Sequence, residues 1–153
     1  MPVKPIPEGH NSVTPYLVVP GVVKLIDFMK RAFGAQEVMP PALDPKGSVM
    51  HAEVRVGDSM IMMAEPGQHC PAMPAALMLY VTDCDAVYRK AIEAGAVSLN
   101  EPADQFYGDR SAGITDPSGN RWWIGTHKED VAPDEMKRRM REVMAKQTGH
   151  ASA

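Results

Sequence analysis

Hydrophobic and polar residues follow two similar patterns, one after the other along the chain. In the first block, alternating and β-branched residues predict strands, and apolar residues at spacings of three and four predict one helix that ends at Gly34. Pro15 favours an edge position or an irregular start for the first strand. The expected order is strand 12–19, helix 22–33, strand 35–39, strand 50–56 and strand 59–64.

The second block repeats this order. It predicts a strand over 76–81, a helix from the N-cap Asp83 to Gly95, and strands over 96–99, 111–115 and 121–125. Leu17-Val18-Val19 aligns with Leu79-Tyr80-Val81 at an offset of 62 residues. The sequence therefore predicts an α+β fold, in which two βαβββ modules form an incomplete barrel of about eight strands around a hollow. We expect one domain over 1–131, made of repeats 12–64 and 76–126.

The C-terminal segment follows a different pattern. Residues 132–147 predict a helix with an apolar stripe of Met136, Met140, Val143 and Met144 beside basic residues, and residues 148–153 predict a frayed tail. We expect this helix to pack on the body of the domain. The alternative is a helix that binds a partner or is exchanged between copies.

Composition excludes several classes of protein. The net charge of −3 gives no basic surface for nucleic acid, and no apolar run is long enough for a membrane span. The first residues lack the apolar core of a signal peptide, so we expect a cytoplasmic protein. Cys70 and Cys84 do not have the spacing of a zinc site. The 12 Met residues are numerous for 153 residues and suit an adaptable binding wall, although Met is also common in cores.

Several motifs in a fixed order resemble the PhnB-like branch of the vicinal oxygen chelate superfamily, which includes glyoxalases, extradiol dioxygenases and bleomycin resistance proteins. The motifs are Pro15-Tyr-Leu-Val-Val19, Arg31-Ala-Phe-Gly-Ala35, Met50-His-Ala-Glu-Val54, Tyr107-Gly-Asp-Arg110 and Asp116-Pro-Ser-Gly-Asn120. The resemblance implies the paired βαβββ fold, a small-molecule site and a homodimer. It does not specify the reaction, because this fold supports unrelated chemistries.

The metal enzymes of this superfamily take His, Gln or Glu ligands from four strands. The matching positions here are Val13, Ile61 (or Met62 if the register shifts by one), Ala76 and Trp123. None of these supplies a nitrogen or oxygen ligand for a divalent metal, so we expect neither a metal nor another cofactor. His51 and Glu53 share one face of a strand and provide an alternative site for a metal or for acid–base chemistry. The simpler interpretation is the polar face of a half-buried strand.

The resemblance also predicts which residues line the hollow. The ligand positions face inward in the family, so their strand neighbours Leu17, Met63, Met78, Tyr80 and Arg121 should join Trp123 there. We expect the adjacent loop to contribute Gln105, Tyr107 and Arg110. Tyr107 and Trp123 suit stacking on a planar ligand, and Arg110 suits a carboxylate or phosphate unless it only braces the turn at Asp109 or Asp116.

Three functions remain after these arguments. The preferred hypothesis is a metal-independent protein that binds a planar or aromatic small molecule in an apolar cavity. The second is a lyase or isomerase of the same fold that uses His51 and Glu53 as acid and base. The third is a protein-interaction module that acts through the C-terminal helix. The turn at Asp116 does not predict a phosphate site, since Pro117 lacks the N–H donor that such a site needs.

Overall fold

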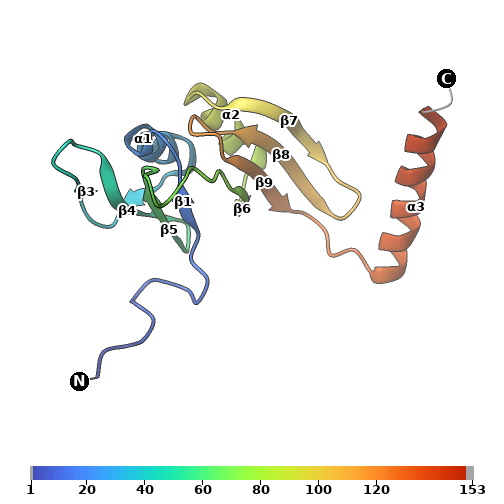
Figure 1. Cartoon of the computed structure of the whole chain (residues 1–153). Helices are drawn as coiled ribbons and strands as arrows, with labels where there is room; N and C mark the ends of the chain where they lie inside the picture. The colour runs from blue at the N-terminus through green and yellow to red at the C-terminus, as the bar shows by residue number, and fades with distance from the viewer. Residues whose placement is uncertain (1, 151–153) are drawn as a thin grey trace.

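The computed structural model describes residues 2–150, which form two modules and a C-terminal helix (Figure 1). Each module runs strand, helix and then further strands, as the repeat predicts. The first contains β1 (Tyr16–Val18), α1 (Val22–Phe33), β2 (Gln36–Glu37), β3 (Ala42–Leu43), β4 (Val49–Val56) and β5 (Ser59–Ala64). The second contains β6 (Ala76–Tyr80), α2 (Cys84–Glu93), β7 (Val97–Asp104), β8 (Asp109–Thr115) and β9 (Arg121–His127).

The strands of each module form a sheet of their own, and the two sheets have the same order. The first sheet runs β1-β5-β4-β2, with β3 also paired to β4, and the second runs β6-β9-β8-β7. In both sheets the first strand lies parallel to the last strand of its module. The α+β class is therefore confirmed, and within residues 2–150 the strands form no closed barrel. A short strand at Ala42–Leu43, in a segment expected to be a loop, brings the described strands to nine.

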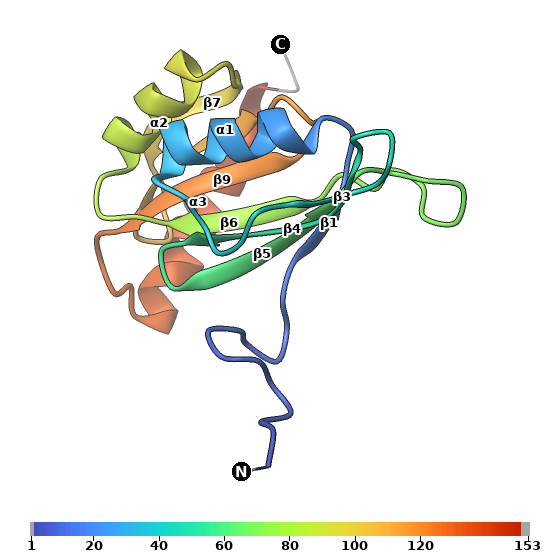
Figure 2. The same ribbon diagram turned by 90° about the vertical axis from the view of Figure 1, so that its left-hand side faces the viewer.

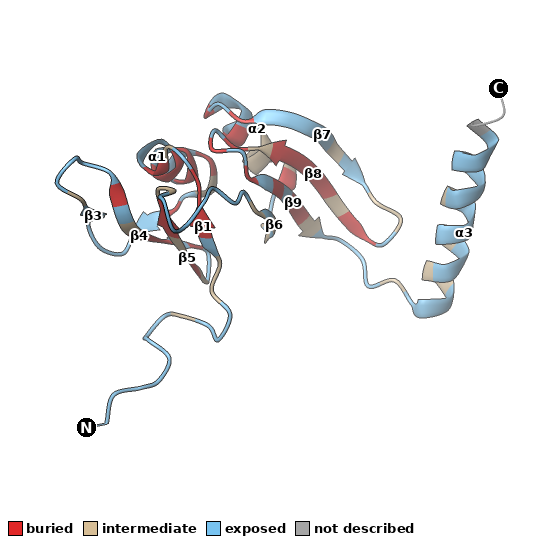
Figure 3. Cartoon of the chain, viewed as in Figure 1, coloured by how far each residue is buried: buried red, intermediate tan, exposed pale blue. Residues whose placement is uncertain are grey.

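The two helices cover one side of the sheets and pack against each other (Figure 2). α1 buries most of the apolar residues that its sequence pattern predicts, among them Leu25, Ile26 and Met29, and it also buries Phe28. From the second sheet, Trp122 and Ile124 join the same core, which lies between helices and strands (Figure 3). Each fully buried side chain of this size contributes about 1.5–3 kcal/mol to folding.

The helix starts repeat the symmetry of the modules. α1 has no side-chain cap of its own, and instead the carboxylate of Glu65 accepts hydrogen bonds from the backbone N–H of Gly21 (3.1 Å) and Val22 (2.7 Å). At α2 the hydroxyl of Thr126 accepts from the N–H of Cys84 at 2.9 Å, in addition to the Asp83 cap. Glu65 directly follows β5, and Thr126 lies in β9, so the two residues occupy similar places in their modules. Each accepts hydrogen bonds from N–H groups that would otherwise lack a partner at the start of the helix in its own module.

The C-terminal helix, α3 (Pro133–His150), stands apart from both sheets (Figure 1). Arg139 fastens its first half, with two hydrogen bonds of 2.9 Å to Glu129 and one of 3.2 Å to the Phe106 carbonyl. Met144 is 58% exposed, so the expected packing of the apolar stripe on the body is not found. α3 runs three residues beyond its predicted end, and the rest of the expected tail lies outside the described residues. Neither α3 nor another helix within residues 2–150 is long and apolar enough to cross a membrane.

Candidate functional site

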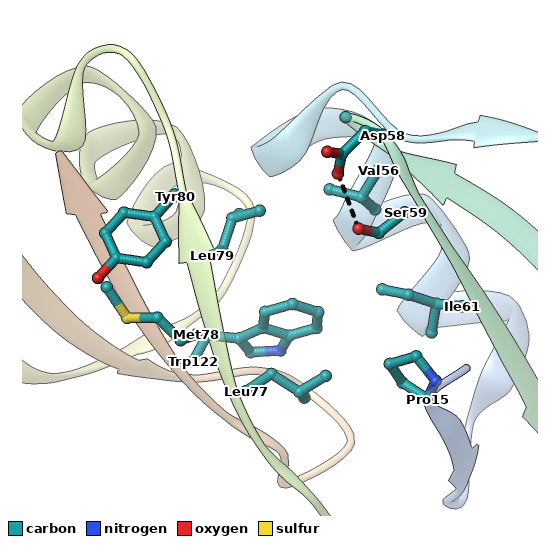
Figure 4. Close-up of a pocket in the computed structure, with 11 residues that line it drawn as sticks. Pro15, Val56, Asp58, Ser59, Ile61, Leu77, Met78, Leu79, Tyr80 and Trp122 are labelled. Atoms are coloured by element: carbon teal, nitrogen blue, oxygen red, sulfur yellow. Dashed lines mark hydrogen bonds between the residues drawn. The ribbon is translucent and has the colours of Figure 1, made fainter. Parts of the chain in front are cut away.

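A cleft of about 590 Å³ lies between the two modules (Figure 4). Leu77 and Leu79 of β6, with Trp122 of β9, form one wall. The opposite wall consists of apolar side chains from the first module, namely Pro15, Val56 and Ile61. This volume and these walls are typical of a small-molecule pocket.

The cleft also has polar lining residues. They are Asp58 of the β4–β5 turn and Ser59 at the start of β5, whose hydroxyl donates to the Asp58 carboxylate at 2.8 Å. Met78 and Tyr80 also border the cleft, although their side chains lie on the other side of the β6 ribbon (Figure 4). The cleft therefore meets the open face of the second sheet along β6.

That open face, the side away from the helices, carries most of the predicted ligand-binding residues. Met78 and Trp123 are paired in register on β6 and β9 and are 44% and 37% exposed. Arg121 lies two residues before Trp123 and is also exposed. Beside Trp123, a shallower hollow of about 400 Å³ is lined in part by Gln105 and Tyr107. The structure therefore brings Met78, Tyr80, Gln105, Tyr107, Arg121 and Trp123 to one face.

A hydrogen-bonded chain at the end of this face fixes Tyr80. The buried carboxylate of Asp109 accepts from the Tyr80 hydroxyl at 2.9 Å and pairs with His127 Nδ1 at 2.7 Å. His127 Nε2 faces Asp130 at 2.8 Å. The hydrogen bonds to Asp109 and then Asp130 raise the pKa of His127, and the bond to Asp109 raises the pKa of Tyr80. His127 therefore favours its charged form and ties the segment before α3 to the sheet.

The open face of the first sheet holds a second polar cluster, around Glu53. His51 Nε2 donates to the Glu53 carboxylate at 2.9 Å, which leaves Nδ1 to accept from the Tyr16 hydroxyl at 3.3 Å. His10, from the segment before β1, places its buried Nε2 at 3.3 Å from the other Glu53 oxygen without hydrogen-bond geometry. Glu53 is itself buried. The predicted pair His51–Glu53 is thus in contact, and Tyr16 and His10 complete the cluster.

Two predicted lining residues lie elsewhere. Leu17 and Met63 are buried in the core beneath α1, with 1% and 0% of their surface exposed. Strand neighbours alternate between faces, so an error of one residue moves a whole set of side chains to the opposite side. Tyr16 and Met62 are paired in register and belong to the open face instead. Met62 therefore lies on the open face with Tyr16, whereas Ile61 points into the cleft between the modules (Figure 4).

Arg110, which the sequence predicted to bind a ligand, is paired with carboxylates of its own chain. Its guanidinium forms a double hydrogen bond with Asp85 of α2 (2.5 and 2.8 Å) and a third with Asp104 (3.2 Å). It therefore lies on the helix side of the sheet, where its charge is already paired. Arg110 joins β8 to α2, and it braces neither Asp109 nor Asp116 as the simpler prediction had it.

The positions that match the family's metal ligands do not supply a ligand set. Val13 precedes β1 and is 85% exposed, and Ala76 and Trp123 are placed on the second sheet with no coordinating atom. Met62 offers only a thioether sulfur. The donor chemistry at these positions does not fit a divalent metal. In residues 2–150, no three His, Cys, Asp or Glu side chains are grouped to hold one.

The β8–β9 turn shapes one wall of the cleft. Asp116 is buried and accepts four hydrogen bonds, from the N–H of Ser118 and Asn120 (2.9 and 3.0 Å), the Asn120 amide (2.9 Å) and the Trp122 indole (2.8 Å). Asn120 in turn accepts from the Ala75 N–H at 2.9 Å, just before β6. The N–H groups of Ser118 and Asn120 in this turn are thus occupied by Asp116.

Sequence reasoning missed the residues that line the cleft most closely. Leu77 and Leu79 alternate with Ala76, Met78 and Tyr80, and every residue of β6 except Ala76 is large and apolar. The pattern therefore gives no signal of which set faces a core, a cleft or solvent. His10 and Glu65 lie in segments without periodicity, and only the structure brings each of them to a partner.

The sequence model of the Glyoxalase/Bleomycin resistance protein/Dioxygenase superfamily matches residues 10–124. An uncharacterized protein of Mycobacterium bovis is 31% identical over 140 residues, which cover 84% of this chain and 91% of that protein.

Solved structures agree on the fold. TioX from Micromonospora sp. ML1 superposes with a TM-score of 0.62 at 19% identity, over 80% of this chain and all of that one. A gene product of Arabidopsis thaliana gives 0.59 at 26% identity, over 74% of this chain and 97% of that one. From the family match over most of its length, the chain belongs to the Glyoxalase/Bleomycin resistance protein/Dioxygenase superfamily.

Proposed function

We propose that this protein binds an apolar, planar or aromatic small molecule in the cleft between its modules, without a metal. The observation that carries the proposal is the cleft itself, whose two walls come from different modules and are apolar on both sides. Trp123 and Tyr107, exposed on the adjoining sheet face, offer flat surfaces on which a ring can stack.

The residues at the family's ligand positions support the same proposal. A catalytic metal needs several nitrogen or oxygen donors that converge on one point, and Val13, Met62, Ala76 and Trp123 provide none. The cleft wall around Leu77, Leu79 and Ile61 is likewise apolar, and it is suited to hold a ligand by shape and apolar contact rather than to polarise it.

A binding assay with acridine, a neutral planar probe, tests the proposal. We expect saturable fluorescence changes and a higher melting temperature, since a ligand that binds only the folded state stabilises it. Leu77→Gln, which makes one wall polar, should weaken binding at least tenfold. Val23→Gln is the matched control, because Val23 is exposed on α1 away from the cleft. Equal affinity in both variants would show that the probe binds elsewhere.

The cluster at Glu53 favours a second function, acid–base catalysis of a lyase or isomerase type. Glu53 orients His51, and His51 Nδ1 is placed to take the proton of the exposed Tyr16. This is the order of groups by which a carboxylate and an imidazole activate a hydroxyl.

The test of catalysis is solvent deuterium exchange into a panel of enolisable carbonyl compounds, followed by NMR. Catalysed exchange should fall at least 100-fold in Glu53→Gln and Tyr16→Phe, in the range expected for the loss of a general base. Both variants should retain acridine binding within twofold. Absence of exchange with the unaltered protein across the panel would leave binding as the function.

We further propose that the chain is a PhnB-like member of its superfamily and forms a homodimer in the cytoplasm. The motif order from Pro15 to Asn120 supports the branch, and the uncovered apolar stripe of α3 supports a surface for pairing. Sedimentation velocity of the purified protein measures the assembly state directly.

A further inference from the structure

The edge of β6 that borders the cleft carries main-chain groups without a strand partner. β6 is the outermost strand of its sheet, with β9 on one side only. The hydrogen bonds Arg121 N–H to Ala75 O (2.9 Å) and Val81 N–H to Gly125 O (2.8 Å) show that residues 75, 77, 79 and 81 face β9. Ala76, Met78 and Tyr80 must therefore direct their N–H and C=O groups to the free edge.

The first module shows how the equivalent edge is used. β1 is likewise the outermost strand of its sheet, and Val18 occupies the place that Tyr80 has in the repeat. The Val18 carbonyl accepts a hydrogen bond of 2.8 Å from the N–H of Met73, and the two residues pair antiparallel. Met73 belongs to the extended connector between the modules. Beside β6, no segment among residues 2–150 takes the corresponding place.

The surroundings of this edge favour a ligand that forms hydrogen bonds with its free main-chain groups. Leu77, Leu79 and Trp122 form the wall on the cleft side of β6, so the free main-chain groups lie at the border of an apolar space (Figure 4). Polar main-chain groups in such surroundings are costly unless they are hydrogen-bonded. A chain of secondary amides in an extended conformation presents donors and acceptors about 6.6 Å apart, the spacing of alternate strand residues.

We propose that the cleft binds a short apolar peptide, or a peptide-like amide compound, in extended conformation along the free edge of β6. Beside β6 the ligand takes the place that Met73 takes beside β1 in the first module. This inference rests on the proposed function, in that the same cleft binds an apolar small molecule, and it assigns the ligand to extended amides rather than to planar rings. Main-chain hydrogen bonds then supply part of the affinity, and the cleft walls receive the apolar side chains.

The first test changes only the ligand. N-acetyl-Leu-Val-Leu-methylamide is compared by calorimetry with its analogue methylated on every backbone nitrogen, which keeps the side chains and removes the donors. We expect the parent peptide to bind at least tenfold more tightly, the effect of one or two net hydrogen bonds. Equal affinity of the two compounds would overturn the inference.

The second test changes only the edge. Met78→Pro removes one N–H that takes no part in the β6–β9 ladder, at a position where an edge strand tolerates proline. We expect it to bind the parent peptide about tenfold more weakly than Met78→Ala, which removes the same side chain but keeps the N–H. Hydrogen exchange provides a readout in the unaltered protein. The amides of Met78 and Tyr80 should exchange faster than those of Leu77 and Leu79, and should slow when the peptide is added.

The remaining outcomes are distinguishable. If acridine binds in the cleft and neither peptide does, the proposed function stands and this inference fails. If neither acridine nor peptide binds, both fail. If Met78 and Tyr80 are protected in the free protein, and the protection grows with protein concentration, a second copy of the chain covers the edge and the inference is wrong.

Discussion

Asp116→Ala is the substitution with the most strongly determined outcome. The carboxylate accepts four hydrogen bonds in a buried turn, and alanine leaves all four donors without an acceptor. At about 1 kcal/mol for each donor, the expected loss in the free energy of unfolding is about 4 kcal/mol. For a chain of this size that corresponds to a melting temperature lower by roughly 8–16 °C. The change also releases Trp122 and Asn120, so it should weaken binding in the cleft.

Urea unfolding followed by far-UV circular dichroism measures this loss. Asp116→Asn is the intermediate variant, because one acceptor oxygen remains. We expect it to lose about half as much free energy of unfolding as Asp116→Ala. Asp27→Ala is the matched control, since Asp27 is exposed and pairs with Arg31 on the same helix, and it should change stability by less than about 0.5 kcal/mol. A loss below about 1 kcal/mol in Asp116→Ala would refute the argument that these four bonds hold the turn.

Two other predictions concern the segment that follows β9. The raised pKa of His127 means that its contribution to stability is complete below its unfolded value near 6.5 and is lost as the pH rises through the folded value. The melting temperature of the unaltered protein should therefore fall relative to that of His127→Asn between pH 6 and 9, and parallel curves would contradict the assignment. Removal of residues 133–153 should leave the melting temperature within about 2 °C, since α3 packs along neither sheet. A larger decrease would show that α3 supports the body, and sedimentation of both forms tests whether pairing depends on it.

The sequence predicted the order of elements well because the repeat occurs twice and each copy supports the other. Apolar periodicity placed α1 at its observed bounds, and Gly34 ends it in the left-handed conformation that glycine adopts most readily. The hairpin β4–β5 was equally clear, because alternation and a Gly-Asp turn coincide. These features depend on neighbours in sequence, which is why the chain alone reveals them.

The candidate site was less predictable because it depends on the register and on distant contacts. The two hairpin turns differ in length, two residues (Gly57-Asp58) against five (Asp116–Asn120), so an equal number of residues after the turn glycines Gly57 and Gly119 leads to opposite faces of β5 and β9. Arg110 matched a ligand-binding role in composition, yet its partner Asp85 lies 25 positions earlier and meets it only through the packing of α2. Pairings of this range leave no mark in local periodicity.

The separation of the two sheets has a consequence for how this protein diversifies. The walls of the cleft belong to different sheets, and the packing of α1 against α2, with Arg31 bonded to the Ala94 carbonyl at 3.3 Å, helps to hold them at their distance. A substitution between the helices would slide one module relative to the other and change the width of the cleft while every residue that lines it stays the same. Such a substitution would change the thickness of the ligand that the cleft accepts without altering any residue that the ligand touches.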